Sequence, residues 1–117
     1  MTGSAEMAEV LARFAEQFNR MPEMPRMTQG WDRWVVVRAR DAGWTHALRV
    51  EGGRMTVGPG PVAGADITLD GPADTLASIF RGELSPTEPY LDGSIAVHST
   101  EEDMLKLDVF TLMVWGE

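Results

Sequence analysis

Several features are missing from this chain of 117 residues, and each absence narrows what the protein can be. Cysteine is absent, which excludes both a disulfide framework and thiolate chemistry. No run of about 18 apolar residues occurs, so we expect no transmembrane helix. The N-terminus lacks the basic stretch followed by an apolar stretch that marks a secretory signal peptide. Together these absences predict a cytoplasmic protein.

Positive charge is scarce. Eighteen Asp and Glu outnumber ten Lys and Arg, which gives a formal net charge of −8. Nucleic acids and anionic membrane surfaces select for basic patches, so we expect neither as a main partner. Lysine occurs once, at Lys106, and with the many Ala and Gly this favours a source with a GC-rich bacterial genome. The length can bury a real core, and we expect one domain over residues 1–117.

Apolar side chains recur at intervals of three and four residues through residues 4–20, which predicts a helix with one apolar face. They are Met7, Val10, Leu11, Phe14 and Phe18. Residues 21–30 hold three Met and two Pro, and each Pro removes an amide donor, so the helix ends before them. We interpret residues 21–30 as a loop packed on the core. A flap of flexible Met side chains over a ligand portal is the alternative.

Residues 31–117 are expected to form a sheet and its covering helices. Residues 34–39 are rich in β-branched side chains, and residues 44–51 alternate apolar with polar positions, so both predict strands. Gly52-Gly53 suits a two-residue hairpin turn, because both turn positions need a positive φ. Residues 54–57 then return as a third strand.

The second half continues with strands and helices in alternation. Residues 66–70 alternate as a fourth strand, and residues 72–80 form an apolar-faced helix with Pro in its first turn. Residues 85–88 (Ser-Pro-Thr-Glu) form a capping box that predicts a short helix. Residues 95–97 are a fifth strand. A second capping box from Ser99 to Glu102 starts a last helix, whose end is left open because its last residues also favour strands.

The expected core follows from these faces. We expect the two buried layers to draw on Phe14, Phe18, Val35, Val37, Leu48, Val57, Ile67, Leu69, Leu76, Ile79, Phe80, Ile95, Val97, Leu105 and Val109. Asp66 and Asp70 fall on the strand face opposite Ile67 and Leu69, so we expect both carboxylates to face solvent.

Four motifs follow one another in the second half. Residues 65–69 read Ala-Asp-Ile-Thr-Leu, residues 81–86 read Arg-Gly-Glu-Leu-Ser-Pro, residues 90–97 read Tyr-Leu-Asp-Gly-Ser-Ile-Ala-Val, and residues 104–115 are mostly apolar. This order resembles the sterol carrier protein type 2 family. There the matching positions read roughly Ala-Asp-Val-Thr-Ile, Gly-Lys-Leu-Asn-Pro, an aromatic with Met-x-Gly-Lys-Leu-Lys-Ile, and a Leu/Met-rich final helix.

The resemblance implies an α+β fold, in which helices cover one face of a five-stranded, mainly antiparallel sheet. A hydrophobic tunnel would lie between the sheet and the helices. The implied function is to bind a lipid, acyl, isoprenoid, sterol-like or polyketide molecule, as a carrier or sequestering module. Asp92 and residues 98–100 depart from the family's usual residues, so neither a sterol ligand nor an organelle address is carried over.

On this basis we expect a mostly apolar ligand pocket between the helix over residues 72–80, the segment after residue 89 and the final helix. The residues expected to bind the ligand are Leu76, Ile79, Phe80, Tyr90, Leu91, Leu105, Val109, Leu112 and Met113. No cofactor is expected. Two His without a third ligand at a recognisable spacing do not predict a metal site. A homodimer remains open.

Two further functions stay open beside the carrier. The same cavity could fold a reactive intermediate for cyclisation or proton transfer, with His46, Tyr90, Asp92 or His98 as acid or base. A ligand-free protein-interaction domain is the third reading. Both His also have ordinary structural explanations, His46 as a hydrogen-bonded residue on an apolar strand face and His98 beside a helix cap. The acidic residues 101–103 suit the N-terminal end of a helix dipole.

Overall fold

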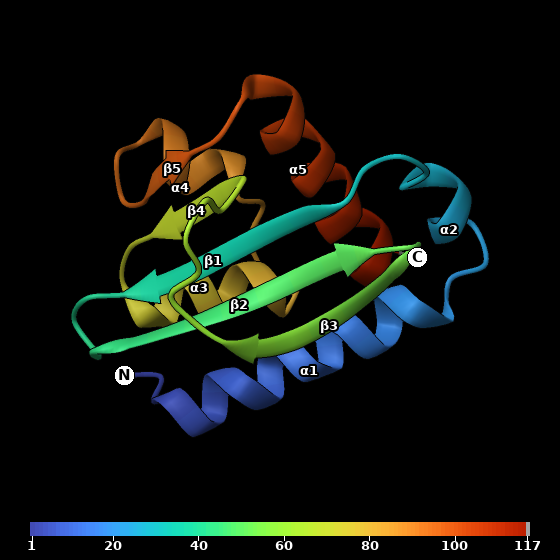
Figure 1. Cartoon of the computed structure of the whole chain (residues 1–117). Helices are drawn as coiled ribbons and strands as arrows, with labels where there is room; N and C mark the ends of the chain where they lie inside the picture. Colours follow the sequence, from blue (N-terminus) through green and yellow to red (C-terminus); the bar gives the residue numbers. More distant parts are fainter. Residues whose placement is uncertain (117) are drawn as a thin grey trace.

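A five-stranded sheet with helices on one face organises residues 1–116, the part of the chain that the computed structural model describes (Figure 1). Glu117, the end of the predicted domain, lies outside these residues. The elements are α1 (Ser4–Arg20), α2 (Met24–Met27), β1 (Arg33–Ala39), β2 (Trp44–Glu51), β3 (Arg54–Pro59), β4 (Ile67–Asp70), α3 (Ala73–Phe80), α4 (Thr87–Leu91), β5 (Ala96–His98) and α5 (Glu101–Trp115). The predicted order is confirmed, and α5 runs helical through Trp115.

The strands lie in the order β3-β2-β1-β4-β5. Neighbouring strands are antiparallel except β1 and β4, which are parallel. The predicted mainly antiparallel sheet is therefore confirmed, with one parallel pair. Gly52 and Gly53 turn the β2–β3 hairpin with φ of 59° and 81°, the positive values that the prediction required.

Aromatic rings join the helices above the sheet. Phe14 of α1 meets Phe80 of α3 edge to face at 5.2 Å between ring centroids, and Phe18 meets Phe110 of α5 in the same way at 5.6 Å. Trp31 packs against Phe110 at 5.4 Å. All five side chains are buried. Such edge-to-face pairs add roughly 0.5–1.5 kcal/mol each beyond burial, so they tie α1 to both α3 and α5.

Residues 21–30 pack on the core and include one turn of helix, α2, that the sequence did not predict. Met24 is fully buried, and Met21 and Met27 are partly buried against the core. Pro25 lies so close to Gly53 that a Cβ there would sit 2.8 Å from the Pro25 Cα. The segment thus covers the end of the β2–β3 hairpin.

The start of α5 is fixed by Asp103. Its backbone N–H donates to Thr100 Oγ1 at 3.1 Å, so Thr100 is the N-cap rather than Ser99, which the capping box predicted. Its buried carboxylate accepts from Trp31 Nε1 at 2.8 Å and from Arg33 Nε at 3.1 Å. Arg33 is the first residue of β1 and Trp31 lies just before it, so this carboxylate holds α5 to the edge of the sheet where β1 begins.

Two expected core residues lie outside. Leu105 is 62% exposed and Val109 is 42% exposed, so their prediction as core was wrong. The inward face of α5 carries Leu107, Phe110 and Val114 instead. Because α5 is apolar on all sides, spacing alone could not choose its buried face.

The expectation that Asp70 faces solvent was also wrong, since its side chain is 8% exposed. Arg38 of β1 and Arg40 in the turn after β1 both donate to Asp70 Oδ2. Burial acts to raise the pKa of Asp70, but the hydrogen bond and charge of Arg38, with those of Arg40, outweigh it and hold this pKa below its ordinary value. Asp66 is exposed, as expected.

Replacing Leu69 by Ala tests the buried face of β4. Leu69 is fully buried, so Leu69→Ala should lower the free energy of unfolding by about 2–5 kcal/mol, measured by urea denaturation. Leu105→Ala is the matched control on the exposed face of α5 and should change it by less than about 0.5 kcal/mol. Equal effects of the two variants would contradict the assigned faces.

The ion-paired Asp70 should make stability depend on acid pH. Its folded-state pKa lies below the ordinary 3.8, so its contribution is complete above that value and is lost as pH falls further. Asp70→Asn should lower the free energy of unfolding at pH 7. It should also make the further loss of stability below about pH 4 smaller than in wild type. Urea midpoints at several pH values measure this. Glu9→Gln, at an exposed carboxylate of α1, should keep the wild-type slope, and the same slope in Asp70→Asn would refute the assignment.

Candidate functional site

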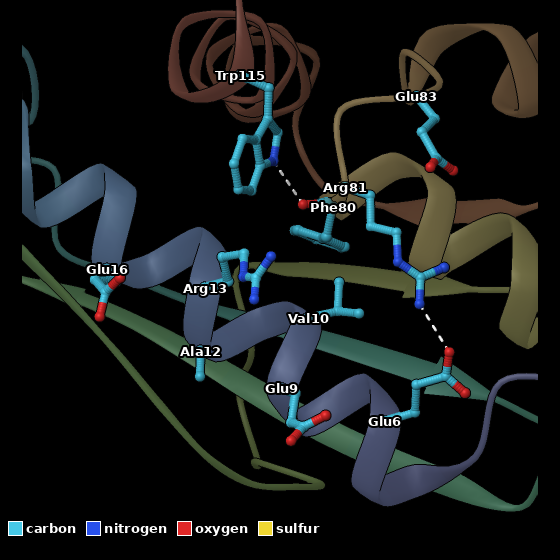
Figure 2. Close-up of a pocket in the computed structure, with 10 residues that line it drawn as sticks. All are labelled: Glu6, Glu9, Val10, Ala12, Arg13, Glu16, Phe80, Arg81, Glu83 and Trp115. Atoms are coloured by element: carbon cyan, nitrogen blue, oxygen red, sulfur yellow. Dashed lines mark hydrogen bonds and ion pairs between the residues drawn. The ribbon is translucent and has the colours of Figure 1, made fainter.

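A groove of about 750 Å³ opens between α1 and the C-terminal ends of α3 and α5 (Figure 2). It combines an apolar floor with a charged rim. The lining residues are Glu6, Glu9, Val10, Ala12, Arg13, Glu16, Phe80, Arg81, Glu83 and Trp115. The groove is the candidate functional site.

The floor of the groove is continuous with the core. Val10 lies at the edge of the buried stripe of α1, and Phe80, fully buried, packs on Phe14 beneath it. Ala12 adds a small exposed side chain on the outer face of α1. An apolar group in the groove would therefore touch the same layer of side chains that covers the sheet.

The rim carries four carboxylates and two guanidinium groups. Arg81 Nη2 pairs with Glu6 Oε2 at 2.8 Å and so links the end of α3 to the start of α1 (Figure 2). Glu16 pairs with Arg20 at 3.6 Å one turn along α1. These pairs are exposed, and each contributes on the order of 0–1 kcal/mol. The rim is therefore exposed to solvent.

Trp115, the last residue of α5, forms one wall. Its indole Nε1 donates to the Phe80 carbonyl oxygen at 2.7 Å (Figure 2). That carbonyl lies in the last turn of α3, where helix carbonyls lack intrahelical partners. Gly82 follows α3 with a φ of 80°, the left-handed conformation that glycine often adopts just beyond a helix end. The Trp115 side chain lies directly against Gly82.

A smaller hollow of about 120 Å³ lies on the other side of Trp115. Its lining residues are Gly82, Leu84, Ser85, Thr111, Leu112, Trp115 and Gly116. Ser85 Oγ donates to Asp108 Oδ1 at 2.7 Å and accepts from the Thr87 N–H at 3.2 Å, so it ties the start of α4 to α5. The hollow is bounded by this fixed loop and by the end of α5.

The structure separates the residues expected to bind the ligand. Leu76, Ile79 and Phe80 are fully buried, and Met113 is partly buried. The other members are exposed on α4 and α5, namely Tyr90, Leu91, Leu105, Val109 and Leu112. Phe80 lines the groove and Leu112 the smaller hollow. Whether any of the nine contacts a ligand stays a prediction.

The sequence reasoning missed the α1 side of the groove and Trp115. Ala12 and Arg13 lie on the polar face of an amphipathic helix, which carries no motif. Trp115 gave one usable signal, a bulky aromatic at the end of an apolar helix. Its partner Gly82 is thirty-three positions away in the chain, so only the fold brings the two together.

The four polar residues considered for catalysis lie apart. His46 lies on β2 with its Nε2 3.2 Å from both the hydroxyl and the carbonyl oxygen of Ser4. His98 lies on β5, separated from β2 by β1 and β4. Tyr90 is exposed on α4. Two hydrogen bonds from Ser94 occupy Asp92 and lower the pKa of this carboxyl.

His46 and His98 also lie on opposite faces of the sheet. His46 is paired with the buried Val37, on the face that the helices cover, whereas His98 is paired with Thr68 on the open face. Within residues 1–116, no three His, Cys, Asp or Glu side chains gather closely enough to hold a metal ion. The same residues contain no helix with the length and apolarity needed to cross a membrane.

The sequence model of the SCP-2 sterol transfer family matches residues 11–99. That range contains the sheet, α3, α4 and most of α1. No curated protein sequence matches the chain significantly.

Solved structures share the fold at low sequence identity. A ubiquinone synthesis protein, UbiJ-SCP2, superposes with a TM-score of 0.73 at 13% identity, over 100% of this chain and 98% of that one. Sterol carrier protein 2 from Yarrowia lipolytica superposes with a TM-score of 0.65 at 15% sequence identity, over 97% of this chain and 93% of that one. A sec-alkylsulfatase from Pseudomonas sp. superposes with a TM-score of 0.62 at 18% sequence identity, over 74% of this chain. This chain spans only 14% and 17% of two such sulfatase structures.

Proposed function

This chain belongs to the SCP-2 sterol transfer family, and from that premise we propose that it binds a hydrophobic small molecule as a carrier or sequestering module. The ligand class is a lipid, acyl, isoprenoid, sterol-like or polyketide molecule. It would enter through the groove between α1, α3 and α5 and rest its apolar part on the floor formed by Val10 and Phe80.

The observation that carries this proposal is the groove itself. Its volume of about 750 Å³ falls within the range of small-molecule sites, roughly 300–1,000 Å³. Its floor is made by core side chains, and its rim is charged and hydrated. An amphipathic ligand matches this division, because its apolar part leaves water while its polar end stays in contact with it.

The positions of the polar candidates support a carrier over an enzyme. A general acid and base must both reach the reacting atoms, each within about 3 Å or through one water. His46 and His98 lie on opposite faces of the sheet, and the Asp92 carboxylate is engaged by Ser94. No pair among the four points into the groove.

Ligand titration tests the proposal. We expect at least one of palmitic acid, farnesol, cholesterol and 11-(dansylamino)undecanoic acid to bind at micromolar concentration, one molecule per chain, by native mass spectrometry. Protein purified from cells under mild conditions should carry a related apolar species. Absence of both co-purified ligand and binding up to about 100 μM, an affinity of roughly −5.5 kcal/mol, would refute the carrier function.

Filling the groove should block binding. Ala12→Trp places a large ring in the groove from an exposed position of α1, so it should weaken binding of the dansyl probe at least about tenfold without unfolding the chain. Ala5→Trp, at an exposed position of the same helix outside the groove, is the control and should bind as wild type does. Equal affinity in both variants would place the ligand elsewhere.

Single replacements of the four polar candidates separate the carrier from an enzyme. His46→Ala, Tyr90→Phe, Asp92→Asn and His98→Ala should each keep probe affinity within about twofold of wild type, because none lines the groove. Their effect on the output of the host cell should be equally small. Loss of about a hundredfold in the turnover of a pathway intermediate from one replacement would instead identify a catalytic group.

A further inference from the structure

Trp115 lines both the groove and the smaller hollow. Val10 and Phe80 line the groove with it (Figure 2). Leu84 and Leu112 line the smaller hollow with it. The linings of the two spaces therefore meet at Trp115.

Two contacts hold the Trp115 side chain in place. One is the hydrogen bond from its Nε1 to the Phe80 carbonyl. The other is its close approach to Gly82, where an added Cβ would lie 2.4 Å from the Trp115 Cβ and 2.5 Å from its Cγ. Real side chains essentially never approach so closely, so the indole can occupy this position only because residue 82 is Gly.

These restraints are weak enough to release. A hydrogen bond of this kind contributes roughly 0.5–1.5 kcal/mol net, because water can take the place of the indole at the carbonyl. Trp115 is partly exposed, in contrast to the buried Trp31 and Trp44. Turning the indole toward solvent therefore breaks one hydrogen bond and the packing of a partly buried ring against the core, and removes a side chain that lines both spaces.

We propose that the groove and the hollow are two parts of one binding site and that Trp115 is the movable partition between them. The inference rests on the proposed ligand binding and deepens it. The ligand is then a single-chain amphiphile. Its polar end stays at the charged rim by Arg13 and Arg81, and its chain passes Trp115 to reach Leu84 and Leu112. The hydrogen bond to Phe80 sets how fast the site opens.

Association kinetics of 11-(dansylamino)undecanoic acid, followed by stopped-flow fluorescence, test the partition. Trp115→Phe keeps the ring but loses the N–H donor, so association should be about two- to tenfold faster. Gly82→Ala pushes the indole away and should accelerate association in the same direction. Trp115→Ala removes the partition and should be at least as fast as either.

Gly93→Ala is the matched control for Gly82→Ala. Gly93 has a φ of 83°, against 80° for Gly82, so both Ala variants carry similar backbone strain. An added Cβ at Gly93 meets nothing within 4 Å. Gly93→Ala should therefore lower the melting temperature comparably yet leave the association rate at the wild-type value. This comparison holds even if Trp115→Ala proves unable to fold.

A second readout follows the ring itself. In protein labelled with 5-fluorotryptophan, the ¹⁹F resonance that disappears in Trp115→Phe should shift on saturation with the probe. The resonance of Trp34, which is stacked on Arg49 on the open face of the sheet, should not.

The outcomes separate the two proposals. If wild type binds the probe, but Trp115→Phe and Gly82→Ala associate no faster than Gly93→Ala and the Trp115 resonance stays in place, the partition is refuted and the carrier function stands. If wild type binds no probe or other amphiphile at all, the carrier function fails and the partition fails with it.

Discussion

The rotation of α5 about its own axis is the constraint on which the candidate site depends. The helix is apolar on all sides, with Leu107 and Phe110 inward and Leu105 and Leu112 exposed, so hydrophobic burial alone leaves several rotations close in energy. The buried carboxylate of Asp103 selects one of them, because its bonds to Trp31 and Arg33 form at a single angle. Leaving that carboxylate unpaired in the interior would be costly.

Three turns along the same helix, this rotation brings Trp115 over the end of α3. There its indole meets the Phe80 carbonyl and the bare backbone of Gly82. The position of the groove wall thus depends on the opposite end of α5, where a hydrogen-bonded carboxylate fixes the helix, as well as on the contacts of Trp115 itself. The acidic first turn of α5 therefore does more than interact favourably with the helix dipole. Its residue Asp103 also fixes the helix through its hydrogen bonds to Trp31 and Arg33.

The second wall, α1, depends on aromatic packing. Its buried stripe places Phe14 against Phe80 and Phe18 against Phe110, so one helix is fixed to two others at once. The ion pair of Arg81 with Glu6 closes the exposed side. Because α1 is held at this distance from α3 and α5, the space between them stays open above the core.

Local signals in the sequence were enough for the order of the elements and for all of them except the short helix α2. The glycine pair at the β2–β3 turn, the proline before α3 and Gly82 after it act within a few residues, so each could be read without the fold. The alternation of apolar and polar residues in β4 likewise acts within a few residues, so it predicted that Ile67 and Leu69 face the helices. The order of the motifs carried the resemblance to the family, since order survives where individual residues change.

Other features were decided by tertiary structure, because their partners are distant in the chain. Asp70 follows the polar pattern of an exposed residue, but β1 lies beside β4 and brings Arg38 to it, which makes burial of the carboxylate tolerable. Leu105 fits a buried stripe as well as Leu107 does, and Asp103 excludes it by fixing the helix rotation. Apart from the short helix α2, the sequence alone determined which segments are strands and helices, through short-range dihedral and hydrogen-bonding preferences. Only packing between distant segments decided which helix face is buried and where the groove opens.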